Sequence, residues 1–212
     1  MDIYLDTASV GEIKKYTYFI DGITTNPSLV SREGSDMLAT LESVSSVFNK
    51  PVHIEVMSIK ADDMFIEGMS YFSVSQNVII KLPATMDGFM ACKKLSDSGV
   101  PTNITLCFSC SQAILAAKCN ATYVSPFVGR LDDSGINGIE RISNIVEIYK
   151  KQEFQTSILA ASIRSIDHVV ECAKVGVDVI TLPPKILEEM IKHDLTSKGL
   201  ECFQRDYWQK RG

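Results

Sequence analysis

The chain has 212 residues, of which 45% are hydrophobic and 22% are charged. This composition excludes a disordered chain, and 12 glycines and 7 prolines exclude a collagen-like or low-complexity one, leaving enough apolar material for one sizeable core. The net charge is −5, from 21 Lys and Arg against 26 Asp and Glu, so no overall basic field attracts nucleic acid or an anionic membrane. An anionic ligand would need a few locally placed cations.

The six cysteines are too few for a disulfide scaffold, and they stand in apolar or helical contexts. The first residues, Met1 to Asp6, carry neither the basic nor the apolar segment of a secretory leader. We therefore expect reduced thiols and a cytoplasmic protein. The uncharged stretch Ser98–Ala117 contains Pro101 and several polar residues, which predicts a buried strand followed by a helix rather than a membrane span.

Short apolar, β-branched runs alternate with longer segments of helical spacing along the whole chain. The runs are Ile3–Asp6, Gly22–Asn26, Val52–Met57, Val78–Leu82, Pro101–Leu106, Thr122–Ser125, Ser157–Ser162 and Val177–Leu182. Strands that alternate with helices indicate parallel βαβ units. No long linker marks a domain boundary, so the pattern predicts one domain over residues 1–212.

Eight βα units favour a closed (β/α)8 barrel, in which no strand edge is left unpaired. The main alternative is an open doubly wound sheet, which usually has a glycine-rich phosphate turn after its first strand. Here Asp6 is followed by Thr-Ala-Ser-Val-Gly, which is not such a turn. The barrel is therefore the favoured fold class.

Helix boundaries carry ordinary signals. Ser9 is expected to cap the first helix, with Glu12 as its capping-box partner. Pro83 and the pair Pro183-Pro184 end their strands and lead towards the next helix. After the eight units, residues 195–208 place Leu, Phe and Tyr on one helical face. This helix has no strand of its own to cover, so we expect it to pack across the barrel or on a neighbouring subunit.

Polar residues stand at or near the carboxyl ends of the apolar runs. With a period of two, the residues that share a face are Tyr4 and Asp6, Thr24 and Asn26, His53 and Glu55, Ile79 and Lys81, Asn103 and Thr105, Tyr123 and Ser125, and Ala160 and Ser162. If these side chains faced the helices, each polar group would lack a hydrogen-bond partner, which would cost about 1–3 kcal/mol of stability. Facing the lumen, they would converge at the mouth where barrel enzymes hold their active sites.

Lys81 is the most informative of these polar residues, because it interrupts an otherwise fully apolar strand. One interpretation is a structural ion pair or a strand-end lysine that extends to solvent. The other is a Schiff-base nucleophile, since amine attack on a carbonyl needs the neutral form and burial disfavours the charged one. On this hypothesis Asp6 and Glu55 should lie at a distance from the amine or act through water.

Asp6 and Glu55 also allow two interpretations. They could pair with Lys81 or cap a following helix. Alternatively, two carboxyls and a lysine are the minimum set for imine chemistry, in which one group shuttles protons and another accepts the hydroxyl proton that starts carbon–carbon cleavage.

Other signals are weaker. Cys107 and Cys110 form a lone C-x-x-C without a second pair, so buried thiols are favoured over a zinc or redox site. The three histidines, at positions 53, 168 and 193, are scattered, and His53 is the least implausible base because it lies below Glu55. Arg130 and Arg164 follow strand ends and could be surface cations or a phosphate clamp.

At these residues the sequence resembles the transaldolase/fructose-6-phosphate aldolase family, specifically its small branch. The matching segments are Leu5-Asp6-Thr7, Gly22–Ser28, Ile80–Pro83, Asn103–Leu106, Ser125–Arg130 and Leu159–Arg164, in order across nearly the whole chain. The resemblance implies a (β/α)8 barrel that needs no metal or organic cofactor, because the protonated imine is the electron sink.

The resemblance also implies residue functions. Lys81 would form the imine with a ketose phosphate, Asp6 would be the base for cleavage, and Glu55 with Thr105 would position the catalytic water. The substrate-binding residues would be Thr25, Asn26, Asn103, Ser125, Phe127 and Ser162, with Arg130 and Arg164 on the phosphate. In the small branch the C-terminal helix packs on a neighbour in a homo-oligomeric ring pentamer or decamer.

Two positions bear on the activity. Aldolases of the family have Gln and Tyr where this chain has Glu55 and Phe127, whereas transaldolases have the pair seen here. Phe127 has no hydroxyl to help protonate the three-carbon carbanion, so the carbanion should survive until an aldehyde acceptor arrives. We therefore expect a transaldolase of the pentose phosphate pathway. The alternatives are an aldolase that releases free dihydroxyacetone and a non-catalytic barrel that binds sugar phosphates.

Overall fold

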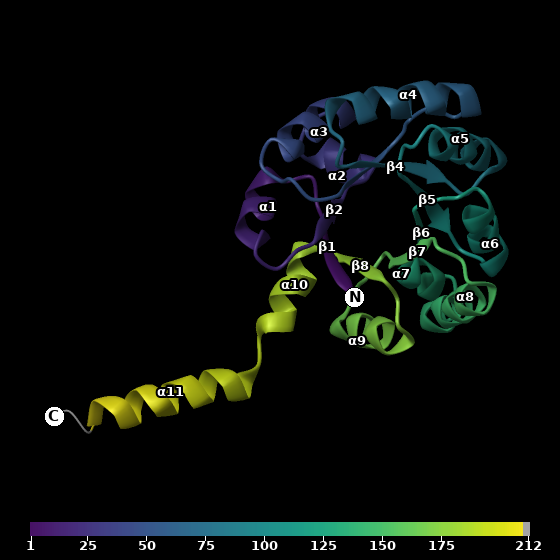
Figure 1. Cartoon of the computed structure of the whole chain (residues 1–212). Helices are drawn as coiled ribbons and strands as arrows, with labels where there is room; N and C mark the ends of the chain where they lie inside the picture. The colour runs from purple at the N-terminus through teal and green to yellow at the C-terminus, as the bar shows by residue number, and fades with distance from the viewer. Residues whose placement is uncertain (210–212) are drawn as a thin grey trace.

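Eight parallel strands close into a barrel in sequence order, with β8 pairing back on β1 (Figure 1). The structure is a computed structural model that describes residues 1–209, so the last three residues of the predicted domain lie outside it. The strands are β1 (Asp2–Asp6), β2 (Gly22–Thr24), β3 (Val52–Glu55), β4 (Val78–Pro83), β5 (Thr102–Cys107), β6 (Tyr123–Pro126), β7 (Ser157–Ala160) and β8 (Val179–Leu182). Each overlaps one of the predicted runs, and the (β/α)8 barrel is confirmed.

Helices form a ring outside the strands (Figure 1). The ring helices are α1 (Val10–Tyr16), α2 (Pro27–Arg32), α3 (Met37–Ser45), α4 (Ala61–Val74), α5 (Met86–Asp97), α6 (Cys110–Lys118), α7 (Val128–Asp133), α8 (Gly138–Gln152), α9 (Ile166–Val175) and α10 (Pro184–Ile191), and α11 (Asp194–Gln209) follows them in the chain. Pro83 ends β4 and the second proline of the Pro183-Pro184 pair begins α10, as expected.

The core has two layers, one on each face of the barrel wall. Leu5, Ile54 and Ile80 belong to the outer layer between strands and helices and are fully buried. The lumen contains Tyr4, whose ring leaves no room for a side chain on β2. A Cβ built at Gly22 would lie 2.4 Å from Cε2 of Tyr4, so glycine is required there.

Two expectations about local structure are wrong. The residues that line the lumen here are Leu159 in β7 and Ala161 just after it, while Ala160 packs in the outer layer. Ser162 still reaches the lumen, because its backbone turns into the left-handed region (φ 60°) just after the strand. Ser9 precedes α1 but its side chain makes no cap bond, and its N–H donates to Thr7 Oγ1 rather than to Glu12.

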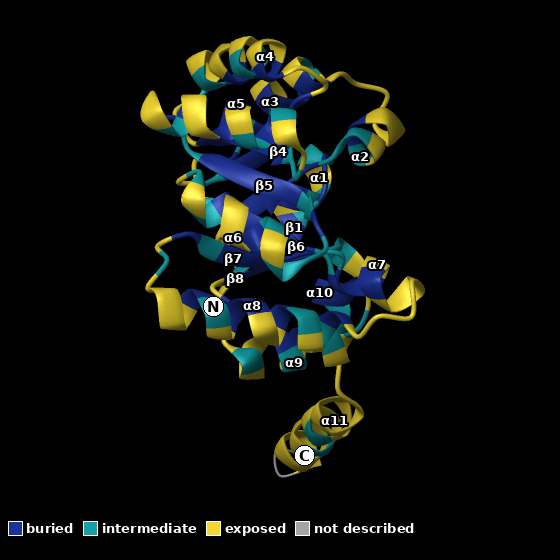
Figure 2. Cartoon of the chain, turned by 90° about the vertical axis from the view of Figure 1, so that its right-hand side faces the viewer, coloured by how far each residue is buried: buried dark blue, intermediate teal, exposed yellow. Residues whose placement is uncertain are grey.

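The last helix, α11, projects away from the barrel (Figures 1 and 2). None of its described residues is buried, and Leu200, Phe203 and Trp208 are 58%, 72% and 65% exposed. The described residues of α11 therefore do not pack across their own barrel, and packing on a neighbouring subunit, the other arrangement expected, stays a prediction. Within residues 1–209 no helix has the length and apolar character needed to cross a membrane, and Ser98–Ala117 contains β5 and nearly all of α6.

Candidate active site

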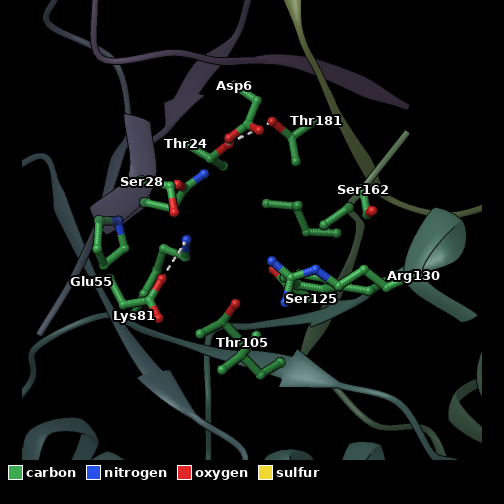
Figure 3. A pocket seen from close by; sticks show the side chains of 16 residues that line it. Asp6, Thr24, Ser28, Glu55, Lys81, Thr105, Ser125, Arg130, Ser162 and Thr181 are labelled. Atoms are coloured by element: carbon green, nitrogen blue, oxygen red, sulfur yellow. Dashed lines mark hydrogen bonds and ion pairs between the residues drawn. The ribbon is translucent and has the colours of Figure 1, made fainter. Parts of the chain in front are cut away.

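A cavity of about 330 Å³ opens at the carboxyl ends of the strands (Figure 3). Its lining is Asp6, Thr24, Asn26, Pro27, Ser28, Glu55, Lys81, Thr105, Leu106, Ser125, Phe127, Arg130, Leu159, Ala161, Ser162 and Thr181. Of the predicted site residues, Thr25, Asn103 and Arg164 are absent from this lining, and the other nine contribute to it. Most of the polar side chains at the strand ends therefore meet in one cavity, as expected.

Lys81 extends from β4 into this cavity and is only 6% exposed. Its Nζ donates to the carbonyl oxygen of Thr25 at 2.6 Å and lies 3.1 Å from Oε2 of Glu55. The expectation that Glu55 stays away from the amine or acts through water is wrong. β3 and β4 pair in register with Glu55 beside Lys81, so the two side chains leave the wall at the same level.

Asp6 lies at the top of the cavity in Figure 3, on β1. Its Oδ1 accepts from the hydroxyl of Thr24 at 2.8 Å, and the Thr24 and Thr181 hydroxyls are 2.6 Å apart. Burial is the main influence on Asp6 and raises its pKa, against the opposing effects of the Lys81 charge and the Thr24 hydrogen bond. A carboxyl in this setting is suited to accepting a proton.

Thr105 presents a hydroxyl that is ready for a ligand or water. Its Oγ1 is buried and has no hydrogen-bond partner among the described residues, although it faces the cavity. The next residue, Leu106, also lines the cavity and has a left-handed backbone (φ 54°). Such strain in a non-glycine residue costs of order 1 kcal/mol and is commonest at functional sites.

Asn103 connects the cavity wall to the barrel floor. Its Oδ1 accepts from the Ser125 hydroxyl at 2.9 Å, and its Nδ2 lies 2.9 Å from Nδ1 of His53. His53 is fully buried, and burial, together with the Lys81 charge, places its pKa well below the ordinary value. A proton-accepting function for His53 at the substrate is therefore not supported, because Asn103 separates it from the cavity.

The loop after β2 supplies a second wall. Asn26 caps α2, its Oδ1 accepting from the Leu29 N–H at 3.0 Å, which leaves the amide Nδ2 to donate into the cavity. Thr25 turns away from the cavity, and its hydroxyl donates to the backbone oxygen of His53 at 3.2 Å. Its contribution to the site is the carbonyl that holds Lys81.

Arg130 points into the cavity from the side opposite Glu55 (Figure 3). Its guanidinium lies 5.0 Å from the ring centroid of Phe127, within the range of a cation–π contact. Phe127 in turn packs against Phe108 in a T-shaped arrangement with centroids 5.5 Å apart. The phenylalanine thus orients the arginine.

Arg164 lies outside the cavity lining and pairs with Asp133, its Nη2 donating to Oδ2 at 2.7 Å. It nevertheless stands close to the rim. A Cβ at Gly129 would lie 2.6 Å from Nε of Arg164 and 2.6 Å from the carbonyl oxygen of Ser162. Only glycine permits this approach between the β6–α7 and β7–α9 segments.

The sequence patterns missed Ser28 and Thr181 as polar lining residues, and they placed Thr24 on the same face as Asn26 without assigning it a function. Period-two alternation could have found Thr181, the third residue of β8, because it follows the inward-facing Val179. Ser28 is the second residue of α2, and no strand-based rule points to it.

The weaker signals do not form sites. Cys107 is buried, which raises the pKa of its thiol to about 12, and its main partner is a backbone oxygen. Nε2 of His168 lies 3.3 Å from Oδ2 of Asp132, and neither residue lines the cavity. His193 immediately precedes α11. No group of three or more His, Cys, Asp or Glu suited to a metal ion occurs within residues 1–209.

Fold and site together define a (β/α)8 barrel with a buried lysine amine and two carboxyls in its carboxyl-terminal cavity. The Transaldolase/Fructose-6-phosphate aldolase family model matches residues 3–210. The chain therefore belongs to this family, and the resemblance inferred from its motifs is confirmed.

Pairwise comparisons with individual relatives agree with this family assignment. The chain is 48% identical to a probable transaldolase of Paracoccus denitrificans and 46% identical to one of Brucella anthropi, in each case over 100% of this chain and 98% of the relative. Among solved structures, the 3-hexulose-6-phosphate synthase of Salmonella typhimurium superposes with a TM-score of 0.68, covering 89% of this chain and 91% of that one. At 14% identity this similarity shows the barrel fold alone.

The raised pKa of Asp6 predicts a pH-dependent stability difference. Between the ordinary carboxyl pKa and the raised one, the folded protein binds more protons at this site than the unfolded chain, so its stability falls as the pH rises. Asp6→Asn should remove this loss, and its advantage over the wild type in urea unfolding should be larger at pH 8 than at pH 4. Asp63→Asn, at an exposed position on α4, is the control. An advantage that does not change with pH would contradict the account.

Proposed function

We propose that this chain is a transaldolase that works through a lysine Schiff base and transfers a dihydroxyacetone unit from a ketose phosphate to an aldose phosphate. The donors would be fructose 6-phosphate or sedoheptulose 7-phosphate, and the acceptors erythrose 4-phosphate or glyceraldehyde 3-phosphate, as in the pentose phosphate pathway. The observation that carries the proposal is the Lys81 amine, buried in the cavity wall beside Glu55 with Asp6 in the same cavity.

The first step joins Lys81 Nζ to the C2 keto carbon of the donor. Glu55, at 3.1 Å, is the nearest carboxylate to accept the amine proton. After attack, the C2 oxygen takes a proton and leaves as water, giving an iminium ion. The unpartnered hydroxyl of Thr105 lies in the same cavity and, with Glu55, is positioned to hold that water.

In the second step Asp6 accepts the proton of the C4 hydroxyl. The C3–C4 bond then breaks, its electron pair moves towards the iminium nitrogen, and the aldose phosphate leaves. The raised pKa of Asp6, caused by burial, makes it a stronger base than an exposed aspartate. Reversal of these steps with a different aldose phosphate completes the transfer.

Transfer rather than release depends on the lifetime of the three-carbon carbanion. Phe127, beside Arg130 in the lining, offers no hydroxyl to protonate it. Cavity hydroxyls and amides from Asn26, Ser125 and Ser162 would hold the sugar.

The phosphate would bind at the Arg130 side of the cavity. A chain of net charge −5 needs local cations for such a ligand, and Arg130 already points inward. Arg164 would exchange its Asp133 partner for the phosphate. A guanidinium can bind a phosphate in the same bidentate way in which Arg164 binds the Asp133 carboxylate.

The assembly would be a cytoplasmic homo-oligomeric ring, a pentamer or decamer, in which α11 packs on a neighbouring subunit. The support is the exposed apolar face of α11, which finds no cover on its own barrel. The six cysteines are all free, as a reducing compartment requires.

Acceptor dependence tests the proposed activity. With fructose 6-phosphate alone, turnover should be slow, and erythrose 4-phosphate should accelerate it at least about tenfold, because the carbanion waits for an aldehyde. The formation of glyceraldehyde 3-phosphate and sedoheptulose 7-phosphate is followed by coupled assay and mass spectrometry. Fast release of dihydroxyacetone without acceptor would instead identify an aldolase, and no conversion under either condition would identify a non-catalytic binder.

Two variants serve as controls for this assay. Lys81→Met should lower turnover by about 10⁴-fold or more while sugar-phosphate binding persists, because the nucleophile is lost and the cavity remains. Phe127→Tyr should increase acceptor-free cleavage, because it introduces a hydroxyl beside the carbanion.

The proposed assembly predicts that Phe203→Glu lowers the molar mass measured by light scattering, because a charge would enter the apolar contact of α11. Lys198→Glu, on the opposite face of this helix, should leave the mass unchanged. A monomeric wild type, or a Phe203→Glu variant with the wild-type mass, would contradict the assembly.

A further inference from the structure

His53 is a fully buried imidazole in the lumen below the cavity. Its ring makes T-shaped contacts with Tyr4 and Tyr123, with centroids 5.4 and 4.8 Å away. Its Nδ1 lies 2.9 Å from Nδ2 of Asn103, while its Nε2 is buried and has no hydrogen-bond partner among residues 1–209. The proposed reaction does not use this residue.

These contacts determine which atoms of His53, Asn103 and Ser125 donate and which accept a hydrogen bond. Nδ2 of Asn103 can only donate, so Nδ1 of His53 must accept and the imidazole proton must lie on Nε2. Oδ1 of Asn103 can only accept, so Ser125 gives its single hydroxyl proton to Asn103. Only lone pairs of Ser125 then remain to face the cavity.

The opposite tautomer of His53 would reverse this order. A proton on Nδ1 would require the Asn103 amide to turn, with its oxygen towards His53 and its NH2 towards Ser125. Ser125 would then accept from Asn103 and donate its proton into the cavity. The state of one buried imidazole therefore decides whether Ser125 accepts or donates at the substrate.

We propose that His53 is a positioning residue that fixes the Asn103 amide and thereby makes Ser125 a hydrogen-bond acceptor for the C1 hydroxyl of the donor sugar. This inference rests on the proposed function, in which C2 is bonded to Lys81. Asp6 on β1 engages C4, and β5 and β6, which carry Asn103 and Ser125, lie across the closed barrel from β1. The C1 end of the sugar therefore points towards Ser125.

Burial keeps the pKa of His53 well below the ordinary value, so the imidazole stays neutral and one ring nitrogen accepts hydrogen bonds. The charge that acts on His53 is that of Lys81, which pairs with Glu55, and it lowers the pKa of His53 in the same direction as burial.

The tautomer is measured directly by solid-state ¹⁵N NMR on the wild-type assembly labelled at histidine. The chain has three histidines, and His53→Asn assigns the signals of position 53 by their disappearance. We expect one unprotonated nitrogen, Nδ1, and one protonated nitrogen, Nε2, throughout the neutral pH range. A proton on Nδ1, or on both nitrogens, would overturn the proposal whatever the enzymatic activity is.

Kinetics of variants test whether Ser125 accepts a hydrogen bond from the C1 hydroxyl of the donor. In the wild type, 1-deoxyfructose 6-phosphate should have a kcat/KM about tenfold lower than fructose 6-phosphate, because the bond to Ser125 is lost. His53→Leu, which offers no acceptor to Asn103, should lower kcat/KM for fructose 6-phosphate severalfold and bring this ratio close to one. His53→Asn, whose Oδ1 replaces Nδ1 as an acceptor, should keep the ratio near tenfold.

Tyr123→Phe is the matched control, because it removes the hydroxyl contact between Tyr4 and Tyr123 beside His53 and leaves the hydrogen bonds of Asn103 intact. It should keep the wild-type ratio. Equal losses with both sugars in His53→Leu, and no recovery in His53→Asn, would show a merely structural function and overturn the proposal. An Nε2–H tautomer in a protein without transaldolase activity would instead contradict the proposed function and leave the relay standing.

Discussion

The site depends on the burial of one lysine amine inside a closed barrel wall. Lys81 could not occupy a fully apolar strand without partners. Its partners are a backbone carbonyl from the loop after β2 and a carboxylate from β3. Parallel pairing in register places Glu55 beside Lys81, so barrel closure and site assembly are one event. The same closure brings Asp6 from the other side of the mouth.

Below this site the lumen is polar as well as aromatic. Tyr4, His53 and Tyr123 fill it, and Asn103 connects this layer to Ser125 at the cavity. Hydrogen bonds within such a floor restrict rotamers and tautomers more than apolar packing does. The precision of the upper layer is therefore set partly by residues that never reach the substrate.

Strand number, fold class and most lining residues could be predicted from the sequence, because period-two alternation and polar strand ends are local patterns. The direct contact between Glu55 and Lys81 was only one of two interpretations, since choosing between them depends on the register between strands. The inward face of β7 was also misjudged. Ser162 enters the cavity through a left-handed backbone that no alternation rule anticipates, and Thr25 contributes its carbonyl rather than its hydroxyl.

The central claim is that the Lys81 amine bonds covalently to the keto carbon of the sugar. Borohydride reduction in the presence of fructose 6-phosphate, followed by peptide mass spectrometry, tests it most directly, because reduction makes the iminium bond permanent. The account predicts a sugar-derived adduct on the peptide that carries Lys81, and none in Lys81→Met. An adduct on a different lysine, or an active enzyme that forms no adduct, would contradict it.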